Sequence, residues 1–177
     1  MKHPAKAYRE HLSELLVAIE RCVYFLDGAC NRVHWPLTGD GLAKHNKELD
    51  LFMALSSINE RFAKLQDTLG AGMRHATLLA GERADTFLQT LAYFEKVGVI
   101  SSVQSWQEMR AIRNLAAHEY GTDYAEIAEH FNTLHDLVPE LFSVARRFCD
   151  YCANQLGIAA AESDFTKDFQ RIVHDSD

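Results

Sequence analysis

The most regular feature of the sequence is the recurrence of apolar residues at helical spacing. In the first such segment these residues are Leu12, Leu15, Leu16, Ile19, Val23 and Leu26. Their spacing predicts an amphipathic helix over about residues 5–27. In a second helix, about residues 42–69, the apolar steps alternate between four and three, which suits packing in an antiparallel bundle. Further helices are expected over about residues 73–80, 83–97 and 102–119, and from Asp123 onward.

Glycine and proline mark where the first helices are expected to end. Pro36, Gly39 and Gly41 predict a loop between the first two helices. Gly70 and Gly72 stand where the C-terminal cap of the second helix is expected. The second helix is therefore predicted to stop there.

The later helices have start and stop signals of their own. Ser101 or Ser102 is suited to cap the helix over residues 102–119, which Gly121 is expected to close. Asp123 begins a variant capping box and a long helix. Pro139 is expected to kink or divide that long helix.

These features predict an all-α fold, an antiparallel bundle of about five main helices. The chain has 177 residues, of which 47% are hydrophobic and 24% charged, and these values fit one globular domain. The bundle is expected over residues 1–157, and the weakly patterned residues 158–177 form a C-terminal tail or a short helix. The sequence contains no internal repeat and no convincing strand.

Composition and charge narrow the class of protein. No stretch approaches the roughly 20 consecutive apolar residues of a membrane span, and the first residues carry no apolar signal region. We therefore expect a cytoplasmic protein whose four cysteines are reduced. The formal net charge of −7 disfavours a long footprint on phosphate backbones, so DNA is not an expected partner. Contact with nucleic acid has to be local.

One polar cluster stands out, at the end of the helix over residues 102–119. It consists of Arg113, Asn114, His118 and Tyr120. Asn114 can hydrogen-bond the His118 imidazole four residues later, and the helix dipole favours an imidazolium there. Arg113 lies about 140° around the helix from His118 and reaches the same substrate by folding over or across an interface with a second copy. A lone histidine at a helix end is more often a cap, but an arginine, an asparagine, a histidine and a tyrosine within eight residues together favour a functional site.

The segment from Arg113 to Tyr120 resembles the signature of the HEPN superfamily, specifically of HepT-like toxins. That signature is Arg, four residues, His, one residue, Tyr. Flanking stretches are similar as well: ERFAKLQDTLG, EKVGVI, Trp106-x-x-Met109 and Val138-Pro139-Glu140-Leu141. The resemblance implies a helical bundle that dimerises so that two motif helices line a shared cleft.

The resemblance also implies an activity, which is RNA cleavage without a metal or another cofactor. His118 would act as general acid or base, Arg113 would stabilise the transition state and Asn114 would orient both. Arg110, on the polar side of the same helix, is expected to contact the RNA substrate. Tyr120 matches the residue that a partner nucleotidyltransferase antitoxin adenylylates, so it is expected to be a modification site.

Two other interpretations stay open. The chain could be a noncatalytic binding subunit of a nucleotidyltransferase, which the acidic balance favours, or a structural dimer whose polar cluster satisfies a buried interface. Cys149 and Cys152 have the spacing of a zinc or redox pair, but no second pair follows them. We therefore expect no metal site.

Overall fold

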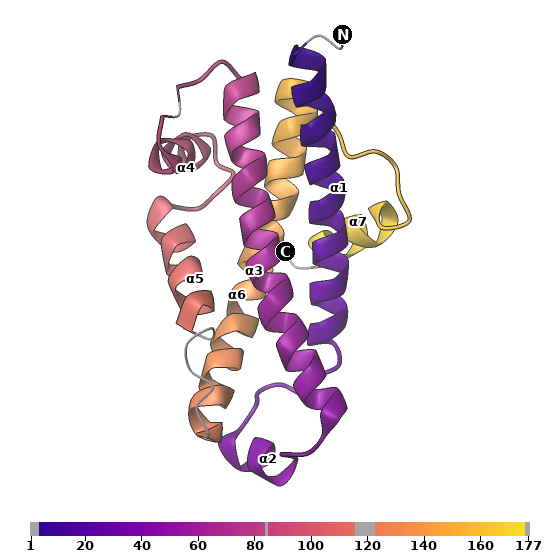
Figure 1. Ribbon diagram of the computed structural model, residues 1–177, viewed down its shortest axis with the longest axis vertical. Helices are drawn as coiled ribbons and strands as arrows, with labels where there is room; N and C mark the ends of the chain where they lie inside the picture. The colour runs from indigo at the N-terminus through magenta and orange to yellow at the C-terminus, as the bar shows by residue number, and fades with distance from the viewer. Residues whose placement is uncertain (1–3, 84, 116–122, 176–177) are drawn as a thin grey trace.

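Three long helices form the centre of the molecule: α1 (Pro4–Cys30), α3 (Leu49–Leu79) and α6 (Tyr124–Tyr151). The computed structural model describes residues 4–83, 85–115 and 123–175. The three helices lie along its long axis, and α2 (Gly39–Lys44) closes one end of the molecule, between α1 and α3 in the chain (Figure 1). The described part of the chain forms helices and no strands, so the predicted all-helical bundle is confirmed.

Shorter helices cover the two edges of this centre. Helices α4 (Phe87–Lys96) and α5 (Val103–Leu115) lie on one edge, where α5 contacts α3 and α6 (Figure 1). On the other edge a π-helical turn, η1 (Cys152–Leu156), leads to α7 (Thr166–Asp175), which packs against α1 and α6. None of the helices within the described ranges is long and apolar enough to cross a membrane.

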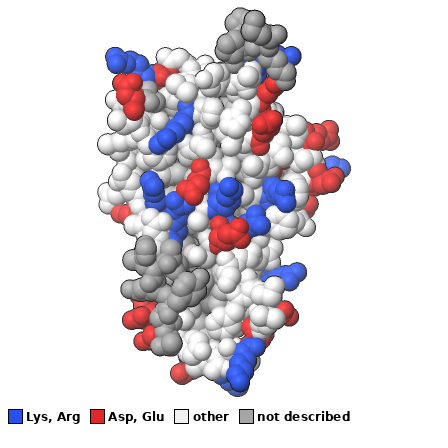
Figure 2. All heavy atoms as spheres, viewed as in Figure 1, with Lys and Arg blue, Asp and Glu red and all other residues white. Residues whose placement is uncertain are grey.

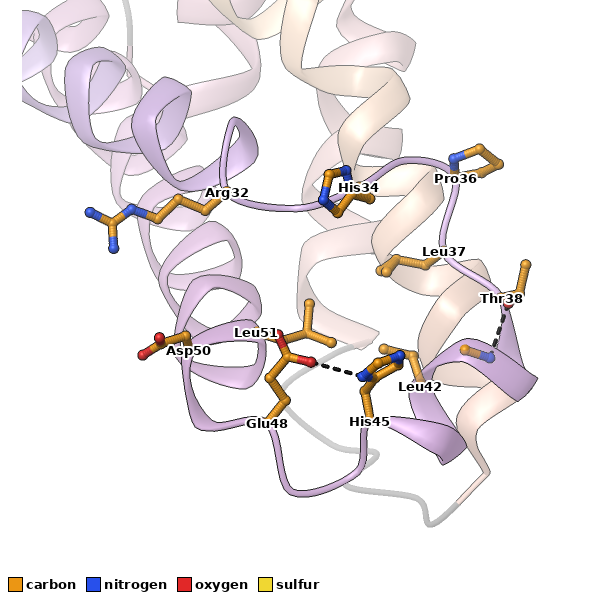
Figure 3. A pocket seen from close by; sticks show the side chains of 11 residues that line it. Arg32, His34, Pro36, Leu37, Thr38, Leu42, His45, Glu48, Asp50 and Leu51 are labelled. Atoms are coloured by element: carbon orange, nitrogen blue, oxygen red, sulfur yellow. Dashed lines mark hydrogen bonds and ion pairs between the residues drawn. The ribbon is translucent and has the colours of Figure 1, made fainter.

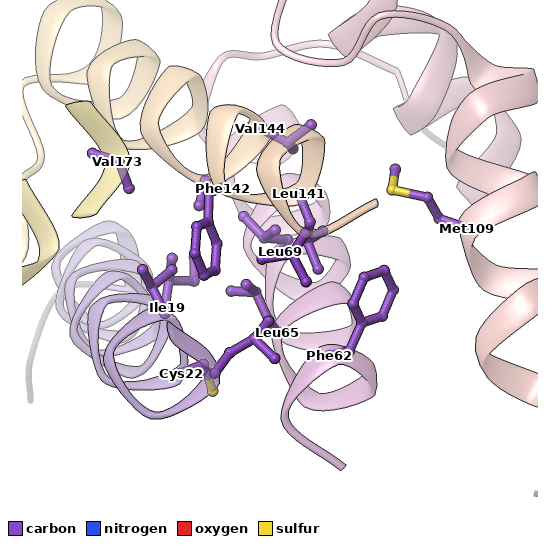
Figure 4. Close-up of a cluster of buried hydrophobic side chains, with 14 of the residues drawn as sticks. Ile19, Cys22, Phe62, Leu65, Leu69, Met109, Leu141, Phe142, Val144 and Val173 are labelled. Carbon is purple, nitrogen blue, oxygen red and sulfur yellow. The ribbon is translucent and has the colours of Figure 1, made fainter. Parts of the chain in front are cut away.

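A single hydrophobic core joins these elements. Helices α1, α3, α5, α6 and α7 all contribute to the cluster in Figure 4, whose labelled residues are Ile19, Cys22, Phe62, Leu65, Leu69, Met109, Leu141, Phe142, Val144 and Val173. Fully burying a side chain of this size stabilises a fold by about 1.5–3 kcal/mol. The short α7 belongs to this core, since Phe169, Ile172 and Val173 are at most 6% exposed.

The predicted end of the second helix is wrong. Helix α3 continues through Gly70 and Gly72 as far as Leu79, and it includes the short helix expected over residues 73–80. A Cβ atom at Gly72 would lie 2.8 Å from Cε1 of Phe148, and one at Gly70 would lie 3.2 Å from Cζ of Phe87. These glycines therefore allow aromatic rings to approach the helix backbone, and they do not cap it.

The loop predicted around Gly39 and Gly41 is also partly helical. Both glycines belong to α2, where Thr38 Oγ1 accepts a hydrogen bond from the Gly41 N–H at 3.1 Å. A Cβ atom at Gly39 would lie 2.9 Å from Cα of Ala125, so this glycine lets α2 contact α6 closely. Pro139 does not divide α6. It is exposed, and the carbonyl group that it leaves without a helical partner can face solvent.

Several boundaries agree with the sequence. Gly98, with a φ of 76°, follows α4, and Gly157, with a φ of 61°, ends the π-helical turn. Asp123 Oδ1 accepts a hydrogen bond from the Ala125 N–H at 2.8 Å at the start of α6. Gly121, the expected end of the motif helix, lies outside the described residues.

Candidate functional site

Helix α5 begins at a side-chain cap and turns its apolar side toward the core. Ser102 Oγ accepts a hydrogen bond from the Ser105 N–H at 2.9 Å, as expected for one of the two predicted capping serines. Trp106 and Met109 are each 2% exposed. Arg113 follows Trp106 by two helical turns, so it lies on the same inward side of the helix.

The Arg113 side chain extends from α5 to α3 within one protomer. Its Nη1 donates to the Ala63 carbonyl oxygen at 2.7 Å, and its Nη2 donates to Asp67 Oδ1 at 2.7 Å. The Arg113 side chain is 7% exposed, whereas the Asp67 side chain is 65% exposed. The guanidinium is thus held by a charge-assisted hydrogen bond at the boundary between the core and solvent.

Arg113 lines an open hollow of about 250 Å³ between α3, α4 and α5, which we call the α5 hollow. The residues around it are Gln66, Asp67, Gly70, Ala71, Arg74, Phe87, Trp106, Arg110 and Arg113. Three arginines and one aspartate therefore line it. Cζ of Arg74 lies 4.7 Å from the centroid of the Phe87 ring, which is the geometry of a cation–π contact.

Two buried polar atoms in the lining of the α5 hollow have no hydrogen-bond partner within the described ranges. Gln66 Nε2 donates to the Trp106 carbonyl oxygen at 2.9 Å, which leaves Gln66 Oε1 as an unpaired acceptor. Nε of Arg113 is an unpaired donor. Buried polar groups are costly without a partner, so both atoms favour a water molecule or a polar ligand beside them.

The structure brings two of the predicted site residues together. Arg110 and Arg113 share the α5 hollow, whereas Asn114 is exposed and is not part of its lining. His118 and Tyr120 lie outside the described residues. Arg113 does not reach over α5 toward the Asn114 side, because its side chain is fixed on α3.

Sequence reasoning did not assign Gln66, Asp67, Arg74 or Phe87 to a site. Asp67 and Arg74 lie two helical turns apart on α3 with Gly70 between them, so these three residues form one stripe. The periodic pattern contained that stripe. The pattern could not predict that the Phe87 ring lies against Gly70, because that contact depends on tertiary packing.

No family model, curated protein or solved structure matches this chain. The case for a function therefore depends on the chemistry of the residues themselves and on the resemblance of the motif.

A second, larger hollow of about 570 Å³ lies at the end of the molecule that α2 closes (Figure 3). Nδ1 of His45 and Oε2 of Glu48 are 2.9 Å apart in it, and Arg32, His34 and Asp50 also line it. The Asn132 amide ties this region to α6, because it accepts from the Leu37 N–H at 2.8 Å and donates to the Leu37 carbonyl at 2.9 Å.

The described residues contain no group of three metal-ligating side chains. Burial raises the pKa of the Cys152 thiol to about 12, and burial also raises the pKa of Cys149 well above its ordinary value. Both thiols are therefore protonated and weakly nucleophilic at neutral pH. This chemistry agrees with a structural role for both cysteines in α6 and η1.

Basic side chains gather in one band on the face that Figure 2 shows, despite the acidic composition. Figure 2 shows Lys and Arg side chains in a band across the middle of the molecule, over α5, α3 and α1, with a few acidic side chains among them. A local contact with a polyanion is compatible with this surface.

Proposed function

We propose that this chain is a HepT-like member of the HEPN superfamily. In this proposal it is a metal-independent endoribonuclease, the toxin of a toxin–antitoxin pair, that acts as a homodimer. The observation that supports it best is the α5 hollow, which Arg74 of α3 lines together with Arg110 and Arg113 of α5, the helix that leads into the motif. Guanidinium groups are suited to phosphate, because they offer paired N–H donors and a permanent positive charge.

The proposed reaction uses the 2′-hydroxyl of RNA as the nucleophile. The 2′-oxygen forms a bond to phosphorus while the bond from phosphorus to the 5′-oxygen breaks, which yields a 2′,3′-cyclic phosphate and a 5′-hydroxyl end. His118 takes the proton from the 2′-hydroxyl or gives one to the leaving 5′-oxygen, and the second His118 of the dimer serves the other step. Arg110 and Arg113 stabilise the additional negative charge on the phosphate oxygens.

The fixed position of Arg113 has two consequences for this mechanism. A guanidinium already held by Ala63 and Asp67 does not have to reorganise during the reaction, which favours electrostatic stabilisation. However, its bonded N–H groups are directed at α3, so the RNA phosphate has to approach from the α5 hollow. Arg110, which is exposed one turn earlier on α5, is placed to make the first contact.

The alternative is a noncatalytic subunit that binds a nucleotidyltransferase and presents Tyr120 to it. The burial of Arg113 and its two bonds to α3 favour this alternative, because an arginine held in this way also serves as a purely structural link. The excess of acidic residues over the whole chain favours it as well.

RNA cleavage by the purified protein in EDTA separates the two functions. We expect cleavage products with 2′,3′-cyclic phosphate ends, and we expect His118→Ala to abolish them. His174→Ala is a matched control, since His174 is an exposed histidine on α7. Intact RNA, or equal cleavage by the His118→Ala protein, would remove the nuclease proposal. A stable complex with a nucleotidyltransferase and a mass increase at Tyr120, without cleavage, would support the alternative.

A further inference from the structure

Three aromatic rings outside the α5 hollow form a cluster, in which two rings are exposed and the third, Phe165, is half-buried. The ring centroids of Tyr24 and Phe25 of α1 are 5.3 Å apart, and they lie 5.4 Å and 5.9 Å from that of Phe165, which precedes α7. Tyr24 is 38% and Phe25 is 37% exposed, although both rings are large and apolar. The cluster fastens the segment before α7 to α1, but that role does not require its rings to face solvent.

Cations surround this aromatic cluster. Cζ of Arg61 lies 5.2 Å from the Phe25 ring centroid, and Cζ of Arg21 lies 5.8 Å from the Phe25 centroid and 5.9 Å from that of Phe165. Burial raises the pKa of the Cys22 thiol, and the positive charges of Arg61, Lys64 and Arg21 all oppose that rise, so all three act on this one side chain. None of these three cations pairs with a carboxylate in the part of the chain that the structure describes.

The cluster and the α5 hollow are connected along α3. Lys64 directly follows Ala63, the residue whose carbonyl accepts from Arg113, and about 5 Å of helix rise separates Lys64 from Asp67. The band of Lys and Arg in Figure 2 crosses the same three helices, α5, α3 and α1. Positive charge therefore extends from the α5 hollow across α3 to the aromatic cluster.

We propose that Tyr24, Phe25 and Phe165, with Arg21 and Arg61, form a stacking platform for single-stranded RNA that enters the α5 hollow. This inference rests on the proposed function and adds a substrate class and a binding surface to it. Aromatic faces stack on bases of any sequence, and the arginines contact phosphates and stack as well. Cations that pair with no carboxylate among the described residues fit a polyanion better than an apolar partner surface. Duplex RNA does not expose base faces, so the strand has to be single.

The test measures binding of a short fluorescein-labelled oligouridylate to the full-length His118→Ala protein by anisotropy at several salt concentrations. The substitutions Arg21→Ala and Arg61→Ala together should reduce the slope of log affinity against log salt by about 1.4, since each phosphate contact of a single strand contributes about 0.7. Phe25→Leu should weaken binding about tenfold and leave that slope unchanged, because it removes stacking and no charge.

Two control variants match these changes elsewhere on the surface. Tyr8→Leu alters an aromatic residue that is 47% exposed on the same helix, and Arg83→Ala removes an arginine whose side chain is 90% exposed. Both should bind as the parent does. Platform variants that keep the parent's affinity and salt slope would overturn the inference. A change in the molecular mass of the dimer, measured by light scattering on these variants, would also overturn it, because the platform would then be an interface between copies.

Cleavage assays with His118 intact keep this inference separate from the proposed function. Cleavage that is unaffected by the platform variants leaves the nuclease and removes the platform. RNA binding that depends on the platform, in a chain that cuts no RNA, leaves the platform and removes the nuclease.

Discussion

The bond between Arg113 and Asp67 determines whether the motif arginine is held in place or free to move. Nη2 of Arg113 and Oδ1 of Asp67 are 2.7 Å apart, a distance at which unit charges attract by about 1.5 kcal/mol in water and about 6 kcal/mol at an effective dielectric constant of 20. Asp67 is 65% exposed, so the water value is closer, and the buried guanidinium adds a desolvation cost. We expect a coupling energy of about 1–2 kcal/mol.

A double-mutant cycle with Asp67→Ala and Arg113→Met measures this coupling by urea unfolding. Methionine keeps most of the aliphatic volume of Arg113 and removes its hydrogen bonds. The matched control is the surface pair of Arg171 and Asp168, whose charged atoms are 3.4 Å apart and whose side chains are 59% and 41% exposed. The coupling energy of this pair should stay below about 0.5 kcal/mol and should disappear at high salt concentration. A coupling for Arg113 as small as that of the control pair would show that Asp67 does not hold the arginine, and the part of Asp67 in the preorganisation described above would be wrong.

Two further predictions concern stability. Gly72→Ala should destabilise the protein by about 1–3 kcal/mol, because its Cβ would clash with the buried Phe148 ring. Gly28→Ala is the matched change, since a Cβ there meets no atom within 4 Å, and it should stabilise the protein by about 0.5–1 kcal/mol. Thermal melting should therefore show a lower melting temperature for the first variant and a higher one for the second. Burial raises the pKa of Glu20 in the folded protein, despite the hydrogen bond from Thr166. The stability that protonated Glu20 contributes is therefore fully present below the pKa of an ordinary glutamate, and it is lost as pH rises through the raised pKa of the folded state. Glu20→Gln should therefore gain stability over the parent between acidic and neutral pH, and a stability difference independent of pH would contradict this.

The helical pattern predicted the fold because each helix is encoded by its own residues. Apolar spacing located α1 and the core side of α5, and local side-chain chemistry located the caps at Ser102 and Asp123. Gly70 and Gly72 were misread because a glycine that ends a helix and a glycine that admits a neighbouring ring are alike in a single sequence. The distinction lies in Phe148, a residue from the other half of the chain.

The site was predicted only in part for the same reason. Arg110, Arg113 and Asn114 were identified by their neighbours along α5, and the seven-residue step from Trp106 could have placed Arg113 on the inward side. Its bond to Asp67 joins residues 46 positions apart, and nothing in the local pattern contains such a pairing.

The two glycines in the middle of α3 also bear on how the chain folds. Glycine lowers the helical propensity of the isolated segment, so this part of α3 is marginal until Phe87, Trp106 and Phe148 pack against it. A nascent chain that ends soon after α3 has none of these rings. Docking of α6 therefore stabilises the middle of the central helix, so folding of the bundle depends on contacts of high sequence separation.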